Sequence, residues 1–145
     1  MSQYNRIFEK SFLATANFDT TTADHAAVYL TASQTINVRA TVTSTPIGIL
    51  QNGGVGGVLS SGMARVLILG TSKLQFNDSI AAGAPFRVNT LGLGIPLNNA
   101  TVTTGNQFIG GISLEALTGT TITGAMAEVL WAPFYAARSD SSTAI

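Results

Sequence analysis

The chain contains no cysteine and few charged residues. Without cysteine, neither a disulfide nor a thiolate metal site can form. Charged residues make up 10% of the 145 residues, compared with about 25% in an ordinary globular protein. Seven basic and seven acidic residues give a formal net charge of zero. That balance offers no electrostatic attraction for nucleic acid, so we expect no nucleic-acid partner.

Long hydrophobic runs are also absent. No apolar stretch approaches the roughly 18 residues that indicate a membrane-spanning helix. The first residues, MSQYNR, lack the continuous apolar segment of a signal peptide. We therefore expect no membrane partner and no secretion signal.

Hydrophobic residues nevertheless make up 46% of the chain, which is too apolar for a disordered protein. With so few charges, either neutral polar residues cover the surface or a partner covers much of it. We favour a partner, because a net charge near zero gives little protection against self-association.

The second half of the chain contains the same pattern twice, in residues 47–68 and 109–131. Each copy has an Ile-Gly step, an apolar strand, a turn rich in small residues, and an Ala-charged-Val-Leu strand. The offset is 62 residues from Gly48 to Gly110 and 63 residues from Ala64 to Ala127. We predict two related β-modules in one structure. Their core should include Ile47, Ile49, Val66, Ile68, Ile109, Ile112, Val129 and Trp131.

Strand signals fill the chain from residue 26 onward. Residues 36–43 alternate between apolar and polar side chains, which is the period of a half-buried strand. Other short strands are predicted at 26–31, 47–51, 65–70, 86–88, 108–114 and 127–131, separated by turns rich in Gly, Thr and Asn. The predicted fold class is all-β: a compact β-sandwich or barrel with two pseudo-repeated modules, a β-domain over 23–135, and an N-terminal arm.

The predicted arm covers residues 1–22. Tyr4, Phe8 and Phe12 are four residues apart, which is compatible with one face of a short amphipathic helix over 4–13. We expect these three aromatic residues to contact a capsid or a neighbouring subunit, because aromatic anchors carry much interface energy. The alternative is an N-terminal element that folds onto its own core. The small, polar residues 136–145 are predicted to form a C-terminal tail that is mobile or held by a neighbour.

Residues with catalytic or ligand-binding chemistry are sparse. The only histidine, His25, follows Asp24, and adjacent residues on a strand point to opposite faces, so we expect no oriented pair. With one histidine and no cysteine, a transition-metal site is not predicted. The stretches GGVGG (53–57) and GTSK (70–73) lack the order of a phosphate-binding loop and are interpreted as β-turns. We predict no cofactor and no enzymatic activity.

Several short motifs follow one another along residues 45–132. They are IGILQN (47–52), ARVLILGTSK (64–73), IAAG (80–83), FIG (108–110), LEA (114–116) and EVL (128–130). Their order and spacing resemble those of the small capsid decoration (cement) proteins of tailed bacteriophages. Residues 1–44 and 133–145 lie outside the resemblance, and the stretch between Val88 and Thr104 fits it less well.

The resemblance implies a structural virion protein, made in the host cytoplasm and located on the outer surface of an icosahedral head. It also implies a compact β-fold, the major capsid protein as partner, and a homotrimer. Such a protein stabilises the shell by bridging neighbouring major capsid subunits. Two alternatives remain open from the residues: a self-assembling shell, tail-tube or fibre β-protein, and a carbohydrate-binding β-sandwich.

Overall fold

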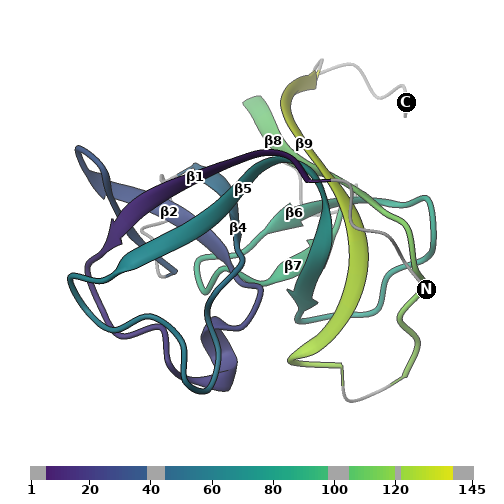
Figure 1. Ribbon diagram of the computed structural model, residues 1–145. Helices are drawn as coiled ribbons and strands as arrows, with labels where there is room; N and C mark the ends of the chain where they lie inside the picture. Colours follow the sequence, from purple (N-terminus) through teal and green to yellow (C-terminus); the bar gives the residue numbers. More distant parts are fainter. Residues whose placement is uncertain (1–5, 39–44, 98–104, 120–121, 139–145) are drawn as a thin grey trace.

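Nine β-strands and one turn of 3-10 helix account for the regular structure of the described residues (Figure 1). The computed structural model describes residues 6–38, 45–97, 105–119 and 122–138. The elements are β1 (Arg6–Ala14), η1 (Thr21–Ala23), β2 (Ala27–Ala32), β3 (Thr35–Asn37), β4 (Pro46–Leu50), β5 (Met63–Phe76), β6 (Pro85–Val88), β7 (Gly94–Pro96), β8 (Gly105–Ser113) and β9 (Ala125–Arg138). The prediction of an all-β fold is confirmed.

The first five strands close into a barrel. Its pairing order is β1–β3–β2–β4–β5, and β5 returns to pair with β1. The β1–β3 pair is parallel, whereas the other four pairs are antiparallel. The N-terminal part of β5 therefore has a partner on both edges, β4 on one and β1 on the other.

The remaining strands repeat this pattern around the C-terminal part of β5. The pairings run β5–β7–β6–β8–β9, and β9 returns to pair with β5. The β5–β7 pair is parallel and the other four are antiparallel, as in the first ring. Strand β5 is thus the last strand of the first unit and the first strand of the second, and Figure 1 shows it crossing from one unit to the other.

Equivalent residues of the two units have equivalent partners. Phe12 pairs with Ala64 in the first unit, and Leu74 pairs with Ala127 in the second, at the offsets of 62 and 63 residues seen in the sequence. An isolated bridge links the two long loops of each unit, at Phe18–Val58 in one and Ile80–Leu117 in the other. The two Ile-Gly steps lie in corresponding strands, β4 and β8. The predicted pseudo-repeat is confirmed.

Each unit has its own hydrophobic core, and β2, β4 and β5 form the wall between the cores. Because successive side chains of a strand point to opposite faces, neighbouring residues of this wall serve different cores. Val28, Leu50 and Val66 join the first core, and Ala27, Ile49 and Leu67 join the second. All six side chains are fully buried. The two units therefore share a wall that is buried on both faces.

The core prediction holds for most residues of the repeat but fails for Ile112. Ile49, Val66, Ile109, Val129 and Trp131 are buried, and Ile47 and Ile68 are half-buried. Ile112 is 38% exposed. A β-bulge between Ile109 and Gly111 adds a residue to the ladder with β9, which shifts the inward and outward alternation.

The N-terminal segment is a strand of the barrel, so the suggested helix over 4–13 is wrong. Strand β1 pairs with β5 from Arg6 to Leu13 and with β3 at Leu13 and Ala14. A spacing of four residues is even, so it places side chains on one face of a strand as well as on one face of a helix. The alternative of an element folded onto its own core accounts for residues 6–18, since Phe12 and Phe18 lie in the first core.

Two segments interpreted as irregular from the sequence are strands. Residues 70–73 lie inside β5 and are not a turn, because their backbone pairs with residues 128–131 of β9. Residues 136–138, assigned to the C-terminal tail, extend β9 and pair with β8. Both segments are stabilised by partners far away in sequence, which their composition does not indicate.

Gly70 lies where β5 passes from one unit to the other. It is opposite Arg6 at the end of the β1 ladder and opposite Trp131 at the start of the β9 ladder. Its φ of 129° lies in the region that strongly favours glycine. This glycine lets one strand change partners without a break.

We expect Gly70→Ala to lower the free energy of unfolding by about 1–3 kcal/mol, because an L-side chain is strained at this φ. Urea denaturation of both proteins measures the difference. An unchanged denaturation midpoint would contradict a conformational role for Gly70.

We expect Trp131→Ala to cost about 3–5 kcal/mol of stability. The side chain is fully buried, and its ring centroid lies 6.1 Å from those of Phe86 and Phe108. Phe134→Ala is the matched control, because Phe134 lies on the same strand but is 52% exposed. Its cost should stay within about 0.5 kcal/mol. Equal losses for the two variants would show that Trp131 is not a central core residue.

Candidate interaction surface

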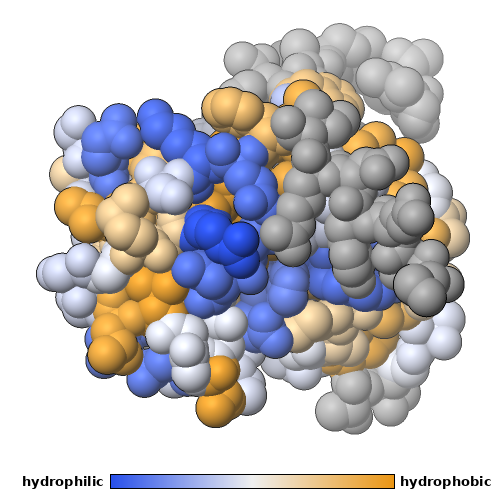
Figure 2. Space-filling model, in the orientation of Figure 1, coloured by the Kyte–Doolittle hydropathy of each residue, from blue (hydrophilic) through white to orange (hydrophobic). Residues whose placement is uncertain are grey.

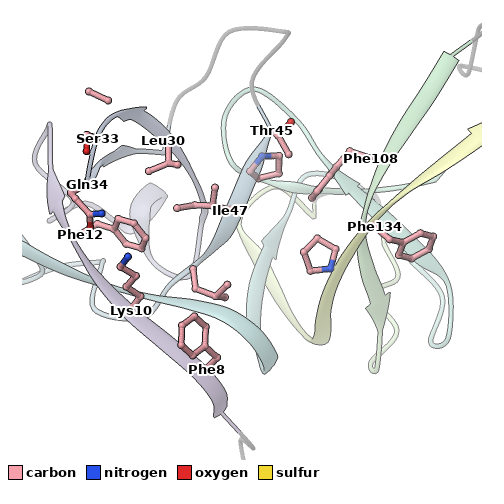
Figure 3. A pocket seen from close by; sticks show the side chains of 14 residues that line it. Phe8, Lys10, Phe12, Leu30, Ser33, Gln34, Thr45, Ile47, Phe108 and Phe134 are labelled. Atoms are coloured by element: carbon pink, nitrogen blue, oxygen red, sulfur yellow. The ribbon is translucent and has the colours of Figure 1, made fainter.

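An apolar groove with a volume of about 630 Å³ lies between the first unit and the far ends of β8 and β9 (Figure 3). Strands β1, β2, β4 and β5 line one side of it, and β8 and β9 line the other. Its lining residues are Phe8, Lys10, Phe12, Leu30, Ala32, Ser33, Gln34, Thr45, Pro46, Ile47, Ile68, Phe108, Pro133 and Phe134. Lys10 is the only formally charged residue among them.

The first wall of the groove comes from alternate residues of β1. Phe8, Lys10 and Phe12 are two residues apart and lie along the same side of the strand in Figure 3. Phe12 is only 6% exposed and belongs to the core, whereas Phe8 is 52% exposed. The Lys10 ammonium lies 5.5 Å from the centre of the Phe12 ring, a cation–π distance that holds the charged group beside an aromatic face. The groove therefore has a buried aromatic floor and an exposed aromatic rim.

The opposite wall is formed where β8 and β9 extend past the second core. Phe108, Pro133 and Phe134 line it, and Phe108 also contacts Trp131. Figure 3 shows Phe108 and Phe134 on this side, across from Ile47 and Phe8. The groove thus joins residues from both units of the repeat.

The three aromatic residues predicted as contacts have different outcomes. Tyr4 lies outside the described residues. Phe12 is packed in its own barrel, so the expectation that it docks on a neighbour as part of an arm is wrong. Phe8 is exposed on the rim of the groove. The sequence did not indicate Leu30, Phe108 or Phe134 as surface contacts, because the groove brings together strands that are far apart along the chain.

Hydrophobic residues are distributed over the surface in separate patches. On the face drawn in Figure 2, hydrophilic residues cross the middle and orange hydrophobic patches lie on both sides. Exposed hydrophobic side chains in the described part of the chain include Phe8, Leu13, Leu30, Val55, Leu59, Met63, Leu69, Leu91 and Phe134. Apolar area of this kind is expected where another protein binds.

Asp24 and His25 form a pair, contrary to the prediction. The His25 Nδ1 atom lies 2.6 Å from the Asp24 Oδ1 atom. His25 has a φ of 49° and precedes β2, so the opposite-face rule for adjacent strand residues does not apply. A carboxylate can thus orient the imidazole here, but a catalytic triad needs a nucleophile in addition. Within the described residues, no hydroxyl group is hydrogen-bonded to the ring.

A second ionic contact links residues 42 positions apart. The Lys73 ammonium on β5 donates to the Glu115 carboxylate at 2.7 Å, and the Glu128 backbone N–H on β9 donates to the same oxygen at 2.8 Å. These hydrogen bonds, the one from Lys73 first, lower the pKa of Glu115 below its ordinary value. The sequence treated Glu115 as isolated, yet this carboxylate joins the loop after β8 to both β5 and β9.

Neither of two further features is found among the described residues. No group of three or more His, Cys, Asp or Glu residues there is arranged to hold a metal ion. No helix in those ranges is long and apolar enough to cross a bilayer. Comparison with known proteins found no family model and no curated protein that matches the chain.

We expect Glu115→Gln to lower stability at pH 7 by less than about 1 kcal/mol, because the pair is largely exposed. The pKa of Glu115 is lower in the folded protein than in the unfolded chain. The stabilisation is therefore present above the unfolded-state pKa and is lost as pH falls through the folded-state pKa. Denaturation of both proteins across this acidic range measures the difference.

Glu128→Gln is the control for Glu115→Gln, because it removes a carboxylate from β9 without touching the Lys73 contact. An NMR titration should also show that Lys73→Met raises the pKa of Glu115 towards its ordinary value. A Glu115 titration that is unchanged in Lys73→Met would contradict the assigned cause.

Proposed function

We propose that this chain is a structural virion protein that binds the outside of an icosahedral phage head and bridges neighbouring major capsid subunits. The observation that carries the proposal is the apolar groove between the two units, with Phe8 and Phe134 exposed on opposite walls. The resemblance of residues 45–132 to capsid decoration proteins supplies the partner. The proposal assigns no catalytic residue and no cofactor to the chain.

The chemistry of the groove favours a protein partner. Its walls are almost entirely apolar, and exposed aromatic side chains are the residues that most often dominate binding energy in protein interfaces. A single ammonium group, on Lys10, borders the aromatic floor and offers one site for a carboxylate or carbonyl oxygen of the partner. An apolar segment of a capsid subunit fits this combination.

The architecture supports a mechanical role. A decoration protein stabilises a shell by mass action, because a ligand that binds only the assembled shell shifts the equilibrium towards that shell. Strand β5 runs through both units and shares a buried wall with each. A load applied to one unit therefore passes to the other through continuous strands instead of a flexible linker. The proposal includes a homotrimer, as the resemblance implies.

The test uses phage heads assembled without this protein. Wild-type protein should co-sediment with the heads up to a fixed ratio to the major capsid protein and should raise their melting temperature. Phe8→Asp and Leu30→Asp should each weaken binding by roughly 30-fold or more, as expected for central contact residues. Both side chains line the groove and are about half exposed, so neither change removes a core residue.

Leu91→Asp is the matched control. Leu91 is 52% exposed, like Phe8, but it does not line the groove. Its binding should equal that of the wild type. The proposal fails if the wild-type protein does not bind heads, or if Leu91→Asp weakens binding as much as Phe8→Asp does.

A further inference from the structure

Strands β8 and β9 continue beyond the second unit as a two-stranded ribbon, which we define as residues 105–109 and 134–138. Its strands pair antiparallel, from Gly105–Arg138 to Ile109–Phe134. Figure 1 shows both strands extending past the other strands of the second unit. A two-stranded ribbon buries little surface by itself and is marginally stable in water.

Within the described residues, the two outer edges of this ribbon have no strand partner. The ladder between β9 and β5 ends at Trp131, and the ladder between β8 and β6 is limited to Gly111 and Ile112. Unpaired strand edges present backbone donors and acceptors to other chains, and most proteins cover or close them. The ribbon therefore presents two edges, one on β8 and one on β9, that can accept further strands.

The internal repeat indicates what covers such an edge. Residues 134–138 of β9 correspond to the part of β5 that follows Gly70 in the first unit. There, the edge that β1 leaves at Gly70 is taken over by β9, which runs antiparallel to β5. By the same relation, the free edge of β9 takes an antiparallel strand. In this chain the sequence supplies no third unit, so that strand comes from another copy.

We infer that three copies of the chain join through these ribbons, with the β9 edge of each copy pairing with the β8 edge of the next. Because β8 and β9 alternate in direction, three ribbons form a continuous antiparallel sheet of six strands that closes on itself. Closure removes every free edge, and a head-to-tail contact that closes produces a ring. This inference rests on the homotrimer in the proposed function, but it is independent of capsid binding.

The first test is the molar mass of the protein in solution, without capsids. Light scattering should give three times the mass of the chain. The double variant Ala136→Pro/Ala137→Pro should give the mass of one chain. Proline lacks an N–H, and neighbouring strand residues direct their N–H groups to opposite edges, so the variant loses a donor on each edge of β9. Its circular dichroism should remain that of a β-protein, because the ladder between β5 and β9 ends before these residues.

The second test uses cross-linking, which the absence of cysteine makes specific. Gln107→Cys and Ala136→Cys are prepared as separate single variants, one with an affinity tag, because Gln107 and Ala136 are already partners within a chain. After mixing and treatment with a short thiol cross-linker, we expect tagged–untagged dimers that link position 107 to position 136. Ala82→Cys, an exposed site between β5 and β6, is the control and should give none.

The outcomes separate the alternatives. A monomer without cross-links, or a trimer in which the ribbon thiols do not cross-link, overturns the inference. Linkage of Ala136→Cys only to itself indicates a two-fold β9–β9 contact and also overturns it. If the double proline variant does not fold, the cross-linking result decides. A protein that forms the cross-linked trimer but does not bind heads would refute the proposed function and leave this inference intact.

Discussion

The wall formed by β2, β4 and β5 is the feature on which the rest of the structure depends. Its side chains are buried on both faces, with Leu50 and Val66 in one core and Ile49 and Leu67 in the other. A strand buried on both faces tolerates no register shift, since a slip of one residue would exchange the two sets of side chains. This constraint fixes β5 as a common strand and sets the position of each unit relative to the other.

The positions of the groove and the ribbon both follow from the shared strand. At Gly70, β5 exchanges β1 for β9 along one edge, so β1 and β9 meet end to end there. Beyond Trp131, β9 has no further room along β5 and leaves the barrel with β8. The groove is the space between this departing pair and the first unit, with Phe8 on one wall and Phe134 on the other. A surface for a partner thus arises from the way in which two barrels share one strand.

The even spacing of aromatic residues at the N-terminus illustrates why sequence patterns can be read in two ways. Positions 8 and 12 share a face in a helix and also in a strand, so periodicity alone did not decide between them. The pairing of β1 with residues 63–70 decided it. The Asp24–His25 pair and the Lys73–Glu115 contact were missed for related reasons. The first depends on a local backbone turn at His25, and the second joins residues 42 positions apart.

The sequence by itself determined the all-β class, the duplication and most of the core, including Trp131. These properties depend on local composition, on alternation and on self-similarity, which can be read without knowing the partner of any strand. Only the tertiary structure decided that the two units share β5, that residues 6–14 complete a barrel, and that the apolar groove forms between the units. Each of these depends on pairing between distant segments. Such pairing is chosen by the burial of whole sheets and leaves little trace in any single stretch of sequence.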